Sequence, residues 1–463
     1  MAQDVALNSG DTAWLLVSSA LVLLMTPGLA FFYGGLNRSS SVLNTMMMSF
    51  SAIGLVSVLW LMYGFTVAFG RDQPIGGNPG FWGDLGQYPG TKVLTAEMGY
   101  PVVPGLGVPT YVVLAFQMMF AVITVALISG SISDRTRFAG WLLFAAGWFT
   151  LAYLPIAHMV WGGGYLGARL GALDFAGGSA VHINAGAAAL ALAIVLGRRA
   201  GWPRESFRPH NVPFVALGAG LLWFGWFGFN AGSQLTADAV AGTAFVNTQV
   251  ATAGAVLGWI TVEWIKNGKP TLVGASSGAV AGLVAITPAC AYVAPYAAIL
   301  LGLAAGTLCA LAVRLKYRLS VDDSLDVFGV HFVGGWIGCL WVGLFATAQA
   351  DGGAYIRHEG LFYGGGLLQF WSQLRAAALV SVWSFVVALV VALLVNSTIG
   401  FRAAREAERD GIDIAEHRES AYDFGPASGG GIFAVAGLTA SPDVGNVSHA
   451  NGGSALANAA ERK

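Results

Sequence analysis

Apolar and polar positions along this chain alternate in long blocks, not in the short periods of a soluble helix or strand. A helix that crosses a bilayer needs about 20 mainly apolar residues. Eleven blocks approach or exceed this length, namely 12–33, 42–69, 110–131, 139–158, 179–197, 213–231, 244–264, 274–290, 297–313, 327–348 and 373–397. The pattern therefore predicts an all-α polytopic membrane protein with eleven transmembrane helices. The two shortest spans, 274–290 and 297–313, are split at Pro288 and Pro295.

Composition excludes several other classes of protein. Charged residues make up 10% of the 463 residues and hydrophobic residues 56%, whereas soluble domains carry about 25% charged residues. Disorder needs low hydrophobicity and high charge, and a net charge of −1 gives no basic field for nucleic acid. The three cysteines lie in or beside apolar stretches, which favours buried free thiols over a disulfide framework or a metal site.

Lys and Arg residues in the connections predict the orientation of the chain. With eleven spans, 18 of the 23 basic residues fall on one side, which is the cytoplasmic side by the positive-inside rule. The N-terminus is then outside and the C-terminus inside. The predicted parts are an external segment (1–11), an eleven-helix membrane domain (12–397) and a cytoplasmic tail (398–463). The tail is charged over 402–420, where a short helix is expected, and is expected to be disordered after about residue 425.

Two segments share a pattern that contains a histidine. Val181-His182-x-x-x-Gly186 begins the fifth predicted span and Val330-His331-x-x-x-Gly335 begins the tenth, and Asp174 and Asp326 precede them. Spans five and ten cross the membrane in opposite directions. The match therefore predicts an inverted repeat of five plus five helices, followed by one extra helix. Such repeats place a substrate path between the halves, near the bilayer midplane.

His182 and His331 enter the membrane from opposite faces, so both approach the middle of a hydrocarbon core about 30 Å thick. An ionised group there costs about 2.5–3.5 kcal/mol, whereas a neutral imidazole can donate through one nitrogen and accept through the other. The two rings can share one proton and line a path for a small molecule. The alternatives are two structural histidines or, less favoured with one histidine per span, a haem. No cofactor is predicted. His158 precedes a Gly-rich turn and is expected at an interface or in solvent.

Five blocks resemble the signature of the ammonium transporter (Amt/Mep/Rh) family, and the bacterial Amt branch fits best. Together they extend in the family's order over most of the chain. They are Pro27-Gly28-x-Ala30-Phe-Phe-Tyr33-Gly34-Gly35, His158-Met-Val-Trp161-Gly-Gly-Gly164, Asp174-Phe-Ala-Gly-Gly-Ser-Ala-Val-His182-Ile-Asn184-Ala-Gly186, Gly225-Trp226-Phe-Gly-Phe229-Asn230-Ala-Gly-Ser233 and Asp322-Asp323-x-x-Asp326-Val-Phe-Gly-Val-His331. The resemblance implies eleven helices, an external N-terminus and a homotrimer with one pore per subunit.

The resemblance also implies roles for single residues. Trp161 and Ser233 match the outer ammonium site, together with Phe120. Phe120 and Phe229 match a stacked gate beneath that site, and His182 and His331 match the twin pore histidines. Asp174 matches the acid that orders the outer site, through backbone hydrogen bonds and not by touching substrate.

The implied function is transport of ammonium or ammonia across the cytoplasmic (inner) membrane, not an enzymatic reaction. Ammonium would be captured outside and deprotonated, and ammonia would pass the apolar pore. Two alternatives remain: an ammonium sensor with secondary conduction, and an Rh-like channel for neutral gas. The implied partners are membrane lipid and, at the cytoplasmic face, a PII-type signal protein. The forty or so residues after Tyr422 depart from the compact tail that the family leads us to expect.

Overall fold

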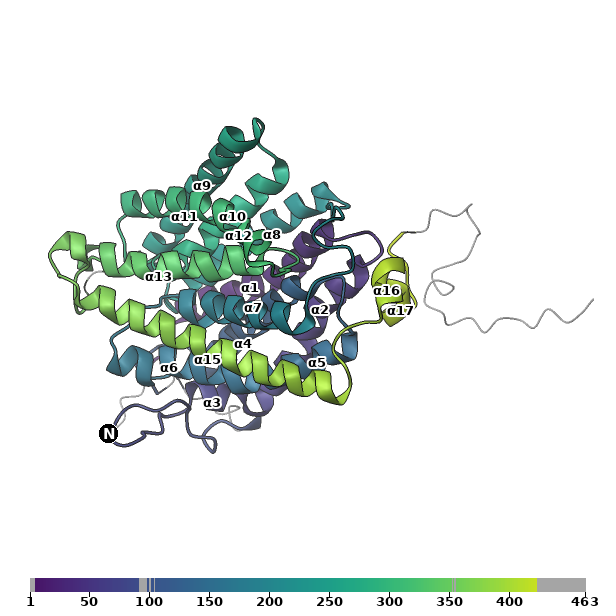
Figure 1. The fold of residues 1–463 in the computed structure, drawn as a ribbon. Coiled ribbons are helices and arrows are strands. Elements are labelled where there is room, and N and C mark those ends of the chain that lie inside the picture. The colour runs from purple at the N-terminus through teal and green to yellow at the C-terminus, as the bar shows by residue number, and fades with distance from the viewer. Residues whose placement is uncertain are drawn as a thin grey trace, which may run out of the picture. The chain divides into compact units, whose positions relative to one another are not determined.

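The computed structural model describes residues 5–90, 98–99, 101–103, 105–351, 353 and 355–422. Nearly all regular structure in these residues is helical, and their β pairings are isolated bridges. The helices (Figure 1) are α1 (Ser9–Leu36), α2 (Val42–Leu59), α3 (Phe65–Phe69), α4 (Thr110–Ile128), α5 (Phe138–Trp148), α6 (Leu154–Trp161), α7 (Asn184–Leu196), α8 (Val212–Gly232), α9 (Ala239–Asn267), α10 (Leu272–Ile286), α11 (Pro295–Ala312), α12 (Leu315–Leu319), α13 (Val333–Phe345), α14 (Ala348–Asp351), α15 (Leu368–Thr398), α16 (Arg405–Asp410) and α17 (Ile412–His417). The disorder expected after about residue 425 lies outside the described residues.

Short π-helical or 3-10 segments extend or join several of these helices. They are η1 (Trp60–Gly64), η3 (Ser129–Ile132), η4 (Phe149–Tyr153), η5 (Tyr165–Arg169), η6 (Gly178–Ile183), η7 (Phe328–Phe332) and η8 (Leu361–Tyr363). With these joins, ten helical stretches in the described part of the chain are long and apolar enough to cross a membrane. Helix α10 is also apolar but has only 15 residues, since it ends at Ile286 before Pro288. The all-α membrane fold is thus confirmed, and the eleventh span stays a prediction.

Large apolar side chains face outward on several of these helices. Leu257 and Ile265 on α9 and Val382 and Leu394 on α15 are each more than half exposed. Many exposed large apolar side chains of this kind mark contact with a membrane or a partner. The scarcity of charge in the sequence therefore reflects an exterior that is apolar as well as an apolar core.

Small residues let neighbouring helices approach closely. Gly302 and Gly306 lie one turn apart on α11, and a Cβ atom added at either would come within 2.1 Å of a carbonyl oxygen on α9, that of Ala251 or Ala255. Close backbone contact of this type is a main source of helix association in membranes, where burial of apolar surface supplies no driving force.

A repeat is visible in the secondary structure around the two histidines. His182 lies in the π-helical turn η6, which leads into α7 with 13 residues, and His331 lies in η7, which leads into α13 with 13 residues. The two segments also pack reciprocally. A Cβ atom at Gly186 would lie 2.6 Å from the backbone nitrogen of Phe332, and one at Gly335 would lie 3.1 Å from that of Ile183. Each glycine thus accommodates the residue that follows the other segment's histidine.

A buried network of charges joins the loops at one end of the bundle. Arg199 binds Asp322 through Nη2 at 2.9 Å and Asp134 through Nη1 at 3.1 Å. Arg135 is completely buried, and its Nη2 atom donates to the carbonyl oxygen of Asp322 at 2.6 Å. Buried ions need such partners because unpaired charges are costly to desolvate.

The tail is docked onto this end of the bundle, where α15 leads into α16 and α17 (Figure 1). Two short helices replace the single one expected over 402–420. The Asp413 carboxylate accepts hydrogen bonds from the backbone N–H groups of Leu43 at 2.9 Å and Asn44 at 2.8 Å, at the first turn of α2. Glu416 accepts one from Phe138, at the start of α5. These carboxylates satisfy N–H groups that a helix leaves free at its beginning.

Candidate outer site and pore

A cavity of about 530 Å³, which we call the vestibule, lies between the ends of α4, α6 and α8 and the loop after η5. Its walls include Phe120, Trp161, Asp174 and Ser233. Gln369, in the first turn of α15, also lines it. Helix α15 is about 46 Å long at a rise of 1.5 Å per residue, and the tail follows its other end. The vestibule and the tail therefore lie at opposite ends of the bundle.

Trp161 and Ser233 contribute an aromatic ring and a hydroxyl to the vestibule. The Trp161 indole is held by its Nε1 atom, which donates to the carbonyl oxygen of Asp174 at 2.8 Å. The Ser233 hydroxyl donates its own hydrogen to the carbonyl oxygen of Phe229 at 2.8 Å. A hydroxyl has one hydrogen and two lone pairs, so the Ser233 oxygen is left as an acceptor. This combination suits a small cation that carries N–H donors.

Asp174 is almost fully buried and uses both of its carboxylate oxygens internally. Oδ1 accepts from the N–H groups of Gly177 at 2.8 Å and Gly178 at 2.6 Å, and Oδ2 accepts from the N–H groups of Ser179 at 2.7 Å and Ala180 at 3.1 Å. The Ser179 hydroxyl also donates to Oδ2. Asp174 therefore fixes the backbone that leads into η6, and its contact with Trp161 is through its carbonyl group.

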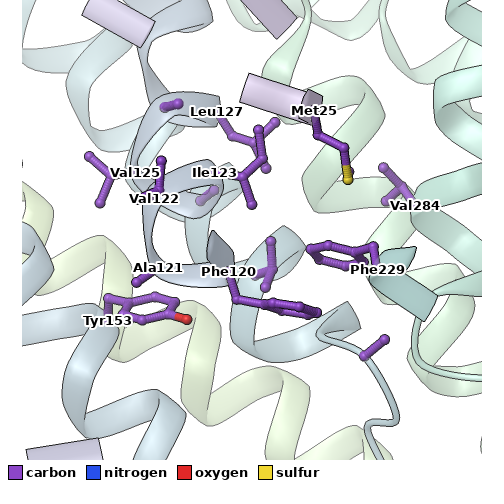
Figure 2. Close-up of a cluster of buried hydrophobic side chains, with 14 of the residues drawn as sticks. Met25, Phe120, Ala121, Val122, Ile123, Val125, Leu127, Tyr153, Phe229 and Val284 are labelled. Atoms are coloured by element: carbon purple, nitrogen blue, oxygen red, sulfur yellow. The ribbon is translucent and has the colours of Figure 1, made fainter. Parts of the chain in front are cut away.

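Phe120 and Phe229 form a stacked pair beneath the vestibule. Their ring centroids lie 4.1 Å apart with an interplanar angle of 12°, and both side chains are buried. Figure 2 shows the rings face to face, one from α4 and the other from α8. The Phe120 and Trp161 rings pack edge to face, with their centroids 6.1 Å apart and an interplanar angle of 90°. The two phenylalanines thus separate the vestibule from the residues below.

His182 and His331 lie below this pair and contact each other directly. Their Nδ1 atoms are 3.3 Å apart, and the His182 ring lies 6.1 Å from the Phe229 ring. His182 also stacks on Trp226, whose Nε1 atom donates to the Thr287 hydroxyl at 2.9 Å. The buried Nε2 atom of His182 has no hydrogen-bond partner among the described residues. One contact between two imidazole nitrogens needs one donor and one acceptor, which two neutral rings supply.

Sequence reasoning missed Gln373, which braces the vestibule from α15. Its Oε1 atom accepts from the N–H group of Leu173 at 2.7 Å, and its Nε2 atom donates to the Leu173 carbonyl oxygen at 2.7 Å. Gln373 is buried, and Leu173 immediately precedes Asp174. The signal in the sequence was a glutamine within an apolar span, where an unpaired amide would be costly.

No group of three or more His, Cys, Asp and Glu side chains in the described residues is arranged to hold a metal ion. The direct contact between His182 and His331 leaves no space for a porphyrin between their rings, so this geometry gives the haem alternative no support. Cys290, Cys309 and Cys339 are buried free thiols, as predicted.

Comparison with known proteins gives the same family in three ways. The family model described as "Ammonium Transporter Family" matches residues 13–422. An ammonium transporter of Mycobacterium tuberculosis is 56% identical over 442 residues, which cover 91% of this chain and 92% of that protein. The crystal structure of Candida albicans Mep2 superposes with a TM-score of 0.79 at 33% identity and covers 86% of this chain and 87% of that one.

A structure titled "Sensor Amt Protein" is also similar, with a TM-score of 0.78 and 27% identity over 88% of this chain and 98% of that one. The helical membrane fold, the repeat around two histidines, and agreement over nearly the whole membrane domain all lead to one assignment. This chain belongs to the ammonium transporter family.

Proposed function

We propose that this chain transports ammonium nitrogen across the cytoplasmic membrane. Ammonium is captured in the vestibule and deprotonated, and ammonia passes an apolar pore lined by His182 and His331. The observation that supports this most is the order of groups along one path. An aromatic and hydroxyl-lined cavity is followed by the stacked Phe120 and Phe229 rings, and then by two histidines in contact at 3.3 Å.

Capture rests on the Trp161 ring, the Ser233 oxygen and the nearby edge of Phe120. A cation over an aromatic face gains about 0.5–2 kcal/mol, depending on how far it is desolvated. The acceptor oxygen of Ser233 adds a directional hydrogen bond that ammonium can make. Potassium has no N–H group, so it cannot use this bond.

Deprotonation provides the second stage of discrimination. A charge in the middle of a bilayer costs about 2.5–3.5 kcal/mol or more, and the path below Phe120 offers aromatic and apolar surface. Ammonium can give its proton to solvent water in the vestibule and continue as neutral ammonia, whereas potassium keeps its charge. The free Nε2 atom of His182 supplies a polar edge for the neutral molecule.

The test is ammonium-evoked flux in proteoliposomes that contain the full chain. A double replacement, His182→Leu with His331→Leu, should reduce the flux at least about tenfold, because no polar edge then remains in the pore. Normal uptake by the double variant would remove the histidines from the mechanism. Leu257→Ala, on the exposed surface of α9, is the control and should transport like the unaltered chain.

The sensor alternative is kept because of the similarity to the structure titled "Sensor Amt Protein". A primary sensor would bind ammonium but carry little flux, so binding without measurable transport would favour it. The Rh-like gas channel is less favoured, because the Trp161 and Ser233 pair suits a cation. It would predict transport that is insensitive to replacement of Trp161.

The proposal includes the setting of the transporter in the cell. The N-terminus lies outside and the C-terminus inside, which places the vestibule at the outer face and the docked tail in the cytoplasm. The parts are an external segment (1–11), the transporter domain (12–397) and the tail (398–463). The chain assembles as a homotrimer in lipid, and a PII-type signal protein is its candidate partner at the cytoplasmic face.

A further inference from the structure

His158 does not lie at an interface or in solvent, as its sequence context led us to expect. It is completely buried on α6, three residues before Trp161. Its Nδ1 atom lies 3.0 Å from the carbonyl oxygen of Ala68, and its Nε2 atom lies 2.9 Å from Oδ1 of Asp72. Both ring nitrogens are therefore within hydrogen-bond distance of an oxygen atom.

The partners determine how many protons these contacts need. The Ala68 carbonyl oxygen can only accept, and a carboxylate oxygen of Asp72 can only accept. A neutral imidazole has one N–H group, so it can satisfy only one of them. Two hydrogen bonds require a hydrogen on both nitrogens, which is the imidazolium form.

The remaining possibility is a protonated Asp72 that donates to a neutral ring. The same Oδ1 atom also accepts a hydrogen bond from the N–H group of Gly80 at 2.8 Å, which favours the carboxylate. The Asp72 side chain is 21% exposed, so water also stabilises its charge. The arrangement is therefore an ion pair with its cation inside the protein.

This ion pair joins three segments of the chain next to the turn of α6 that ends at Trp161. Ala68 belongs to α3, Asp72 lies in the loop that follows α3 and leads to Gly80, and His158 lies on α6. The glycine turn after Trp161 rests against the ring: a Cβ atom at Gly162 would lie 2.5 Å from His158 Nδ1, and one at Gly164 would lie 2.9 Å from Cδ2. The N–H groups of both glycines donate to the His158 carbonyl oxygen, at 2.8 and 3.1 Å.

We infer that His158 is a buried imidazolium, paired with the Asp72 carboxylate, and that it acts as a positioning residue for Trp161 in the vestibule. It touches no substrate. It fixes the last turn of α6 against the loop and α3, and thereby the angle at which the indole faces the cavity. The positioning role rests on the proposed function of the vestibule, whereas the protonation state does not.

The protonation state can be measured directly. Nitrogen-15 spectra of the full chain with labelled histidine, assigned by comparison with His158→Gln, should show both His158 nitrogens protonated at neutral pH. Asp72→Asn removes the negative charge that pairs with the imidazolium, so a neutral His158 ring with one N–H group is expected in this variant. One of the two nitrogen signals should then move to the unprotonated range. An unprotonated ring nitrogen in the unaltered chain would overturn the ion pair.

Transport separates a positioning role from a merely structural one. Asp72→Asn should raise the KM for ammonium by about three- to tenfold with little change in maximal flux, because the outer site is disturbed and the pore is not. Asp84→Asn, in the same loop, is the control, since its Oδ1 atom accepts only from the N–H group of Gly86 among the contacts described. An unchanged KM in Asp72→Asn, with the ion pair established by the spectra, would overturn the positioning role. If the unaltered chain shows no ammonium flux at all, the proposed function itself is contradicted.

Discussion

The rings of Phe120 and Phe229 lie parallel at 4.1 Å and close the path between the vestibule and His182. Stacked apolar rings exclude water and ions, as hydrophobic constrictions do in channels. Their separation is too small for any molecule to pass between them without rotation of a ring. The pair is therefore the natural place to test selectivity.

Replacing Phe229 with alanine should admit water and let potassium leak. We expect the preference for ammonium over potassium to fall at least about tenfold, because the dewetted constriction is lost. The measurement is potassium and ammonium flux in the same proteoliposomes. Phe227→Ala is a matched control: Phe227 lies on α8, as Phe229 does, but it stacks on Phe245 of α9 at 4.1 Å and 15° and does not line the vestibule. Equal selectivity in both variants would contradict the gate.

Gly186→Ala should destabilise the protein. The new Cβ atom would lie 2.6 Å from both the backbone nitrogen and the Cβ atom of Phe332, so η7 must move. Overpacking of this kind costs about 1–3 kcal/mol, and it should lower the thermal midpoint in detergent. Gly220→Ala, where nothing lies within 4 Å of the new atom, is the control and should not lower the midpoint. A midpoint unchanged in Gly186→Ala would mean that the two segments can separate freely.

Gln373→Ala should weaken ammonium binding more than it slows maximal flux. The N–H and C=O groups of Leu173 would both lose a partner, and a buried unsatisfied group costs about 1–3 kcal/mol. The loop that holds Asp174 and the Trp161 indole would loosen, which raises KM. Gln373→Glu keeps an acceptor for the N–H group but loses the donor, so its KM should be intermediate. Val382→Ala, exposed on the same helix, should have no effect.

Asp322 and Asp323 are neighbours whose pKa values shift in opposite directions. Burial, and then the charge of Asp326, raises the pKa of Asp323 to about 6 from its usual 3.8. Burial also tends to raise the pKa of Asp322, but the hydrogen bonds and charge of Arg199 outweigh it and lower the pKa. Asp323 therefore binds its proton more tightly in the folded state than in the unfolded state.

An acid of this kind stabilises the fold fully below its unfolded pKa and loses that contribution as pH rises through the folded pKa. Asp323→Asn should remove the loss of folding stability that occurs as the pH rises from 3.8 to about 6. It should then raise stability at pH 7 by on the order of 1–3 kcal/mol. The measurement is the thermal midpoint against pH. Asp322→Asn should do the reverse and lower the midpoint at pH 7. Parallel pH curves for the unaltered chain and Asp323→Asn would argue against the shift.

Asp413→Ala should release the tail from α2. The carboxylate receives two backbone N–H groups at the start of that helix, and a cap of this type contributes about 0.5–2 kcal/mol. Hydrogen exchange over residues 405–422 should become faster while the rest of the chain is unchanged. Glu419→Ala, at an exposed position in the same tail, is the control. Equal exchange in both variants would show that Asp413 does not hold the tail.

Hydropathy alone predicted most of the fold, because each span must satisfy its own backbone and bury its side chains in lipid or protein. Predictions from hydropathy were wrong where a local feature of the chain, and not the length of the apolar run, determines the helix. Helix α10 ends at Ile286 because the chain turns before Pro288, so its 15 residues are fewer than the apolar run suggests. The π-helical turns at His182 and His331 were not predicted, because hydropathy carries no information about helical register.

The candidate site was predicted through resemblance and not through periodicity. The motif brought Trp161, Ser233, Phe120 and Phe229 together, and the structure places them along one path. His158 was misjudged because its partner, Asp72, lies 86 residues earlier in a loop that no pattern links to α6. Gln373 was missed for a similar reason, since it acts on a backbone segment 200 residues away.

The reciprocal contacts of Gly186 and Gly335 bear on how fast this protein can work. The two histidine segments, whose backbones touch here, have no layer of side chains on which to slide, and this opposes rocking of one segment against the other. In the proposed path, opening then comes from rotation of single side chains, which takes far less time than the microseconds to milliseconds of domain motion. Under the proposed function, each turnover is then limited by proton transfer and ring rotation, and not by movement of these two segments against each other.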